Sequence, residues 1–221
     1  MASDGPCGVL ELRRYTLLPG RRDELIELFD AHLVEPQEEV GIHVLGQFRD
    51  VERPDHFVWI RGFADLASRT QGLTRFYLEG DAWARHRSAA NATMVDSDDV
   101  LLLRPAPGMA HPCRGVGPRD APSGHRAPYA VLVHHLRDAD EKGSQRWLAD
   151  AQSVVHALAG KVVGVLRTES APNGFPRLPV REDADVLVLI ARFGSLDAAA
   201  ATPGLGAERL VLVPTSRSSL R

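Results

Sequence analysis

The segment Phe-Tyr-Leu-Glu-Gly-Asp-Ala-Trp-Ala-Arg-His-Arg, residues 76–87, decides how the first half of this 221-residue chain folds. The segment contains three aromatic rings, a histidine and two arginines, and its spacing predicts that it is part of one helix from about residue 74 to 92. Gly80 inside that helix costs about 1 kcal/mol relative to alanine, which indicates close approach of another backbone or of a ligand. The segment therefore predicts a helix packed on a sheet, with a ligand site beside it.

Four strands are predicted around this helix. Residues 9–16 and 56–63 alternate between two faces, as half-buried strands do. Residues 43–50 and 100–104 give the other two strands. In residues 56–63 both faces are apolar, so both are expected to be covered.

The first of the two helices is predicted directly after Pro19-Gly20, with an apolar stripe at three- and four-residue steps. Pro36 cannot lie in a regular helix interior, so a kink or break is expected near Leu33. Asp65 is placed to cap a short helical piece before the helix of residues 74–92. The resulting order is βαββαβ.

The second half of the chain repeats this order in degenerate form. Residues 162–167 copy residues 44–49, and residues 188–193 copy residues 58–63. Residues 106–128, rich in proline and glycine, form a linker between residues 1–105 and residues 129–221. The second hairpin is longer and the second helix is shorter, so the halves are expected to share a fold but not a site.

Two such four-stranded sheets can hide their open faces by packing together as a barrel. The prediction is an α+β fold in which tandem βαββαβ repeats pair within one chain. Such a chain can in addition pair with a second copy, as a homodimer, through its remaining strand edges.

Composition excludes several function classes. The net charge of -3 and the scattered basic residues argue against nucleic acid or an anionic membrane as a partner. No apolar run is long enough for a membrane span, and the start lacks the pattern of a signal peptide. Cys7 and Cys113 are too few for a disulfide framework or a cysteine-ligated zinc site. The simplest interpretation is a reduced, cytoplasmic protein, and the arginine and alanine bias suggests a bacterial source.

The first half resembles the NIPSNAP family. The segments that carry the resemblance are Val9-Leu10-Glu11-Leu12-Arg13-Arg14-Tyr15 before Pro19-Gly20, residues 45–48, residues 56–63, the pattern of residues 76–98, and residues 100–105. The resemblance implies a ferredoxin-like fold of the dimeric α/β-barrel superfamily. That superfamily includes antibiotic biosynthesis monooxygenases, haem proteins like chlorite dismutase, and small polyketide cyclases. It also implies a ligand between the sheet and its helices, but no single reaction.

Three residues are the candidates for catalysis. His32 lies on the apolar stripe of the first helix, His86 follows Trp83 by about one turn, and Arg61 shares a strand face with aromatic rings. A histidine can transfer a proton, and an arginine can neutralise a carboxylate or enolate. Each also has a structural interpretation. His32 can be a hydrogen-bonded core residue, and His86 can lie solvated at the helix edge. Arg61 can form a buried ion pair with Glu11, Asp96 or Asp98.

The candidate substrate-binding residues are aromatic or basic and flank these three: Arg13, Tyr15, Trp59, Phe76, Tyr77, Trp83 and Arg87. Aromatic walls with a few polar groups are typical of small-molecule pockets. Which face of strand 9–16 lines the pocket is left open, and no metal-ligand motif is predicted.

Three functions remain. The first is an enzyme without organic cofactor, acting on an apolar, aromatic or enolisable metabolite as a monooxygenase, cyclase or lyase in bacterial specialised metabolism. The second is a non-catalytic binding or scaffold protein. The third is a haem protein with a single histidine ligand.

Overall fold

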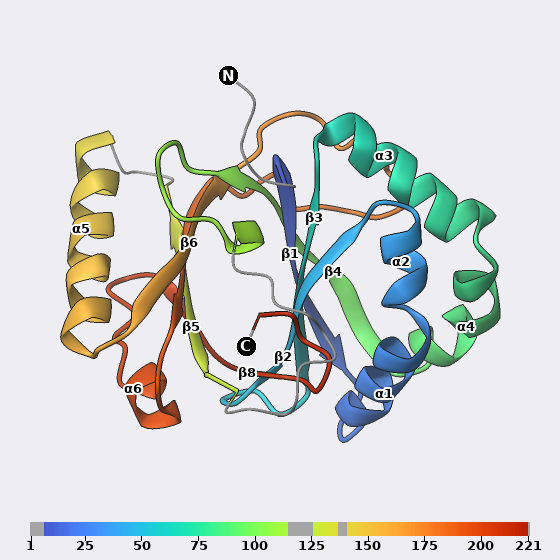
Figure 1. Cartoon of the computed structure of the whole chain (residues 1–221), viewed down its shortest axis with the longest axis horizontal. Coiled ribbons are helices and arrows are strands. Elements are labelled where there is room, and N and C mark those ends of the chain that lie inside the picture. Colours follow the sequence, from blue (N-terminus) through green and yellow to red (C-terminus); the bar gives the residue numbers. More distant parts are fainter. Residues whose placement is uncertain (1–6, 115–125, 137–140, 221) are drawn as a thin grey trace.

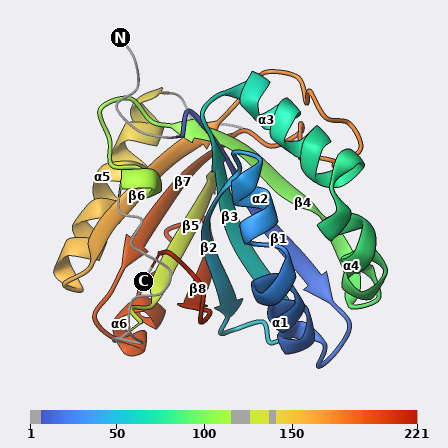
Figure 2. The ribbon, with the colours of Figure 1, turned by 45° about the vertical axis from the view of Figure 1, so that its right-hand side comes forward.

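A computed structural model of the chain describes residues 7–114, 126–136 and 141–220, and it shows a closed barrel of eight strands (Figure 1). The strands follow one another around the barrel in the order β1-β3-β2-β8-β5-β7-β6-β4. Figure 2 shows α1–α4 on one side of the barrel and α5 and α6 on the other.

The elements of the first half are β1 Val9–Leu17, α1 Arg22–His32, α2 Glu35–Glu39, β2 His43–Asp50, β3 His56–Phe63, α3 Leu66–Thr74, the π-helical turn η1 Arg75–Glu79, α4 Asp81–Asn91 and β4 Met94–Pro105. A short 3₁₀ turn, η2 Pro112–Arg114, follows. Those of the second half are β5 Tyr129–His135, α5 Glu141–Ala157, β6 Lys161–Thr168, β7 Val186–Arg192, α6 Leu196–Ala200 and β8 Glu208–Pro214.

The two halves use the same strand order and are joined at two short seams. Within each half the order is fourth, first, third and second strand, all antiparallel. The register of β2 slips between Val44 and Gly46, and that of β6 slips between Val162 and Gly164. The β2–β8 and β4–β6 pairings close the ring. The barrel is therefore closed within one chain, although each seam pairs only three residues of either strand.

The two faces of each strand meet different cores. Leu10 and Leu12 of β1 point into the barrel, where they pack with apolar side chains from both halves. Tyr15 and Val9, on the other face, pack with the helices of the first half. The helix-covered face of β1 is therefore the one that carries Glu11, Arg13 and Tyr15.

The prediction of one continuous helix over residues 74–92 is wrong. The chain passes from α3 into η1, and Gly80 then adopts an extended conformation that breaks the helix before α4 begins at Asp81. A Cβ at Gly80 would lie 2.6 Å from the carbonyl oxygen of Phe76. The glycine is thus required by close approach of its own chain, and the aromatic and basic residues of segment 76–87 lie on two elements.

Two other predictions about the helices are confirmed. α1 ends at His32 and α2 begins at Glu35, so the break near Leu33 is confirmed, with Pro36 in the first turn of α2. Asp65 caps α3 by accepting a hydrogen bond from the Ser68 amide.

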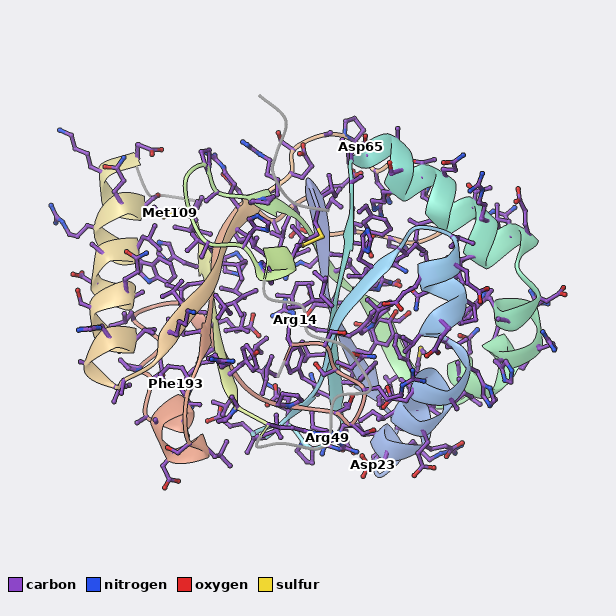
Figure 3. The ribbon with its side chains drawn as sticks, in the orientation of Figure 1. Arg14, Asp23, Arg49, Asp65, Met109 and Phe193 are labelled. Atoms are coloured by element: carbon purple, nitrogen blue, oxygen red, sulfur yellow. A yellow bond between two sulfur atoms is a disulfide. The ribbon has the colours of Figure 1, made fainter. Side chains whose placement is uncertain are left out.

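The expectation of reduced cysteines is wrong. Cys7 and Cys113 form a disulfide that ties the residues before β1 to the segment after β4 (Figure 3). Both residues are buried in the barrel core. Disulfides persist in oxidising compartments, so cysteine usage does not support a reducing location.

Candidate functional site

A buried ionic cluster lies on the helix-covered face of β1 and β3. Glu11 is its only carboxylate: its Oε2 accepts hydrogen bonds from Arg13 Nη1 and Arg61 Nε, and its Oε1 accepts one from Arg69 Nε, each at 2.7 Å. All four side chains are at most 1% exposed. This arginine cluster, Glu11 with Arg13, Arg61 and Arg69, has three guanidinium charges for one carboxylate.

The pKa values reflect this imbalance. Burial by itself raises the pKa of Glu11, but Arg61, Arg13 and Arg69 outweigh it and hold that pKa far below its usual range. Burial lowers the pKa of Arg69, and Glu11 does not fully compensate because Arg61 and Arg13 repel the same charge. Glu11 is therefore a structural anion in this site and not a proton donor at neutral pH.

Aromatic rings enclose the arginine cluster. The Arg61 guanidinium lies 5.0 Å from the centre of the Trp59 ring, and that of Arg13 lies 5.5 Å from the Trp59 ring and from the Tyr15 ring. Such cation–π contacts replace part of the hydration that the buried cations lose.

Two phenol oxygens are oriented by the arginines. Arg13 Nε donates to Tyr15 Oη at 3.0 Å, and Arg61 Nη1 donates to Tyr77 Oη at 3.2 Å. Arg61 Nη1 also donates to Gln37 Oε1 of α2. Because each phenol oxygen accepts from an arginine, its own O–H is left to donate in another direction. Burial raises the pKa of Tyr15, so it stays protonated as a donor.

A pocket of about 320 Å³ opens beside these groups, and we call it the aromatic pocket. It is lined by Arg13, Tyr15, Tyr77, Leu78, Trp83, Arg87, Asn91, Met94, Ser97, Asp98, Phe175, Arg177, Leu178 and Pro179. An inner lobe of about 30 Å³ shares Tyr15, Tyr77, Trp83 and Met94 with it and reaches Trp59 and Phe76. The pocket therefore has aromatic walls and a buried arginine at its inner end.

The second half supplies one wall of this pocket. The long segment between β6 and β7 crosses to the first half, where Phe175 and Leu178 line the aromatic pocket. Its Asn173 Oδ1 accepts a hydrogen bond from Arg69 Nη1 at 3.0 Å. The hairpin between β6 and β7, which the sequence predicts to be longer than its counterpart, thus covers part of the first half.

The predicted site residues fall into three groups. Those that line the aromatic pocket are Arg13, Tyr15, Tyr77, Trp83 and Arg87. Trp59 and Phe76 line only the inner lobe, and Arg61 lies behind Tyr77 in the arginine cluster.

His32 and His86 form the third group, outside both lining sets. Their rings stack on each other, with centres 4.1 Å apart, between α1 and α4. The pKa of His86 is lowered by partial desolvation and, in addition, by electrostatic repulsion from His32 and Arg85. The structure thus brings the two histidines to each other and not to the arginines.

Sequence reasoning missed three contributors. Arg69 and Gln37 lie on helices, where a polar residue reads as solvated, and Phe175 lies in the second half. The predicted ion pair of Arg61 with Glu11 is confirmed. The available signal was that a strand carries Glu11 and Arg13 on the face that must be covered by helices.

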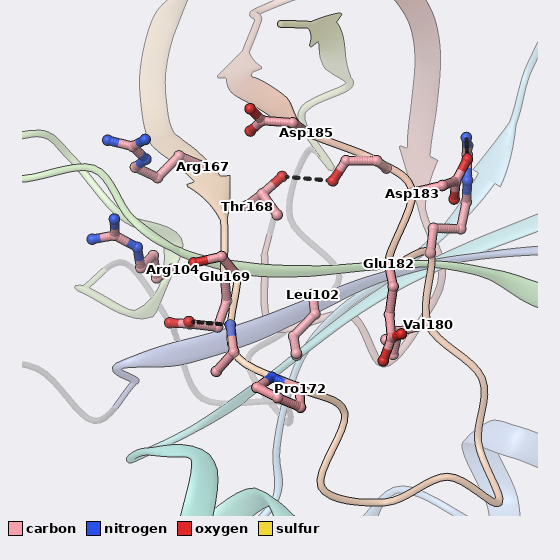
Figure 4. Close-up of a pocket in the computed structure, with 14 residues that line it drawn as sticks. Leu102, Arg104, Arg167, Thr168, Glu169, Pro172, Val180, Glu182, Asp183 and Asp185 are labelled. Carbon is pink, nitrogen blue, oxygen red and sulfur yellow. Dashed lines mark hydrogen bonds and ion pairs between the residues drawn. The ribbon is translucent and has the colours of Figure 1, made fainter. Parts of the chain in front are cut away.

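A second pocket, of about 560 Å³, lies at the β4–β6 seam (Figure 4). Its charged lining residues are Arg104, Arg167, Arg181, Glu169, Glu182, Asp183 and Asp185. It is larger, but its lining includes no aromatic side chain, and its acidic and basic groups are nearly balanced. Since most of these side chains are half-buried or exposed, the aromatic pocket is the stronger candidate site.

Comparison with known proteins agrees with the architecture. Residues 10–108 match the NIPSNAP family model. The first half of this chain is a NIPSNAP domain. Among curated protein sequences, none matches the chain.

Solved structures show the same fold at low identity. A candidate monooxygenase from Lactobacillus acidophilus is 13% identical with a TM-score of 0.53, covering 96% of this chain and 94% of that one. One from Fusobacterium nucleatum is 8% identical with a TM-score of 0.55, covering 95% and 93%. A NIPSNAP family protein from Agrobacterium tumefaciens is 19% identical with a TM-score of 0.42, covering 45% and 94%. The first two show that the whole chain, NIPSNAP domain included, has a fold found in these proteins.

Two features are absent from the described residues. No group of three or more His, Cys, Asp or Glu within residues 7–114, 126–136 and 141–220 is placed to hold a metal ion. None of the helices found there is long and apolar enough to cross a membrane.

Proposed function

We propose that the NIPSNAP domain binds a small organic metabolite in the aromatic pocket and acts on it without an organic cofactor, as a monooxygenase, cyclase or lyase. One observation carries the proposal: a pocket of about 320 Å³ has aromatic walls and ends on buried Arg13. Apolar walls with a few convergent polar groups are the usual form of a small-molecule site.

The groups in the pocket suit chemistry that develops negative charge on oxygen. Arg13, with the hydroxyls of Tyr15 and Tyr77, can stabilise an enolate, which is a common intermediate of these three reaction types. Asp98 is the carboxylate in the pocket lining and can accept a proton from a carbon acid. Because His32 and His86 lie outside the lining, the proposed proton-transfer groups are Asp98 and Tyr15.

We also propose that residues 1–105 and 129–221 are tandem ferredoxin-like repeats. The shared strand order and the matching register slips before Gly46 and Gly164 support this interpretation. Closure of the barrel within one chain then takes the place of pairing with a second copy.

The alternatives are a scaffold without a ligand and a haem protein. No histidine lines the aromatic pocket or its inner lobe, so a haem there needs Tyr15, Tyr77 or Met94 as its axial ligand. A Soret band on haem titration, lost in the matching variant, would favour the haem alternative.

A ligand screen with two tryptophan variants tests the proposal. Wild-type protein is screened against a metabolite library by thermal shift and compared with Trp83→Ala and Trp147→Ala. Trp83 lines the aromatic pocket, whereas Trp147 packs on the second half. We expect hits that Trp83→Ala loses and Trp147→Ala keeps. If every hit survives Trp83→Ala, or no compound binds, the site is not a metabolite pocket.

A further inference from the structure

The inner end of the aromatic pocket has an uncompensated positive charge. The arginine cluster holds three guanidinium groups and one carboxylate, all buried. Arg61 Nη2, Arg69 Nη2 and Trp59 Nε1 are buried without a hydrogen-bond partner in the part of the chain that the structure describes. Burying a charge is costly unless it is paired, so an excess of two cations is expected to have an anionic partner.

One of these cations faces the pocket. Arg13 is 1% exposed yet lines the aromatic pocket. Its Nε and Nη1 are used by Tyr15 and Glu11, while its Nη2 has no hydrogen bond to any described residue. Arg13 therefore presents a free donor of a charged group to the pocket interior.

The two phenols add neutral donors at the same place. The oxygens of Tyr15 and Tyr77 accept from Arg13 and Arg61, so their hydroxyl hydrogens are free for a ligand. Both residues line the pocket and its inner lobe. Three donors at one end of the pocket fit the two oxygens of a carboxylate.

The mouth of the pocket has the same sign. Arg87 of α4 and Arg177 of the crossing segment line it, and neither has an ion-pair partner among the described residues, whereas Asp98 is the lone carboxylate of the lining. The chain as a whole is acidic, with a net charge of -3. The lining therefore has three arginines, Arg13, Arg87 and Arg177, for one carboxylate, and this excess positive charge attracts anions toward the inner donors.

We infer that the ligand of the aromatic pocket is an organic carboxylate with an aromatic or otherwise apolar body. Its carboxylate binds Arg13 and the hydroxyls of Tyr15 and Tyr77, and its body lies between Trp83 and Phe175. This inference rests on the proposed function for the location of the site. It adds the chemical class of the ligand.

A matched pair of probes tests the inference. The planar acid 1-naphthoate and its neutral amide, 1-naphthamide, have nearly the same shape and differ in charge. Their binding to the full chain is measured by isothermal titration calorimetry at pH 7. We expect wild-type protein to bind 1-naphthoate at least about tenfold more tightly than 1-naphthamide, because charge-assisted hydrogen bonds are the stronger kind.

Variants assign the difference to named groups. Arg13→Gln is expected to weaken 1-naphthoate about 10- to 100-fold and Tyr77→Phe about fivefold, with 1-naphthamide changed less than about threefold. Tyr77→Phe keeps the aromatic ring, so it still tests the inference if Arg13→Gln does not fold. Arg85→Gln, on α4 but outside the pocket lining, is the charge control and should bind like wild type.

The outcomes separate this inference from the proposed function. Equal binding of both probes, each lost in Trp83→Ala, means a metabolite pocket without selectivity for anions, and overturns the inference alone. Tighter 1-naphthoate binding that survives both Arg13→Gln and Tyr77→Phe places the anion elsewhere and also overturns it. Binding of neither probe contradicts the inference for aromatic acids, while the library screen still decides the proposed function.

Discussion

Where β1 meets β3, Glu11 lies opposite Arg61; at the corresponding position where β5 meets β7, Ala130 lies opposite Ala191. The next pair along the strands is Arg13 with Trp59 in the first half and Leu132 with Leu189 in the second. Both sets face helices and both are buried. The same sheet geometry is therefore built once around charge and once around small and branched apolar side chains.

The difference shows that the fold does not require the arginine cluster. In the second half α5 covers the alanines and leucines with Trp147, Ala151 and Val155, which is an ordinary apolar core. Buried ion networks can often be replaced by apolar residues of similar volume with no loss of stability. The ligand that we propose for the aromatic pocket gives these charges of the first half a function.

Glu11→Ala should have the largest effect, because it leaves three buried cations without a carboxylate. We expect a loss of about 3–5 kcal/mol in the free energy of unfolding, measured by urea denaturation. The double variant Glu11→Ala/Arg61→Ala copies the second half and keeps the net charge of the cluster. The double variant should be more stable than the single variant. If it is no more stable, the fold does require the arginine cluster.

Loss of the disulfide should come next. The second half has no cysteine, so Cys7→Ala/Cys113→Ala removes a cross-link between the start of the first half and the segment after β4 that has no counterpart in the second half. The cross-link spans 106 residues, and such links contribute about 2–4 kcal/mol. Urea midpoints with and without dithiothreitol should differ for wild type and coincide for the variant. Wild-type curves that also coincide would show that the bond does not form.

Acid should weaken the charged half selectively. The pKa of Glu11 is lowered in the folded state, so its contribution is complete above the unfolded value of about 4.3 and is lost as the pH falls below about 4. Amide hydrogen exchange should show β1 and β3 losing protection before β5 and β7 between about pH 4 and pH 2. Glu11→Gln should remove this order, whereas Glu27→Gln, exposed on α1, should keep it. Equal loss in both halves would contradict the assignment to Glu11.

Substitution of the stacked histidines should have the smallest effect. His86→Gln is expected to leave 1-naphthoate affinity within about twofold of wild type, because neither His86 nor His32 lines the aromatic pocket. The lowered pKa of His86 means that its stacking is disturbed only as the pH falls below about 6.5, the value for unfolded histidine. A tenfold loss of 1-naphthoate affinity in His86→Gln at pH 8 would show that His86 takes part in ligand binding.

Strands β2 and β3 could be predicted because alternation is a local signal. β2 and β3 begin and end where residues 43–50 and 56–63 predict, since each strand has one apolar face toward the barrel. The break at Gly80 could not be predicted in the same way. A helix with one glycine is acceptable by propensity alone, and only the contact with the Phe76 carbonyl decides against it.

The site was predicted in its residue types but not in its assembly. Tyr77 and Trp83 line the pocket whether or not they share a helix, so their prediction does not depend on the helix boundary. Arg69 and Phe175 reach the site from 58 residues and more along the chain from Glu11. Single-sequence patterns carry no information on such distant pairings, and the same holds for Cys7 with Cys113.

The crossing segment between β6 and β7 affects how mutations can change the binding site. In a barrel made from two identical chains, any mutation alters both copies of the binding site at once. Here a mutation near Phe175 alters the cover of one site without touching the strands beneath it. If the halves are the tandem repeats that we propose, the second half can change this segment by mutation, so ligand preference can change while the opposite sheet keeps its packing.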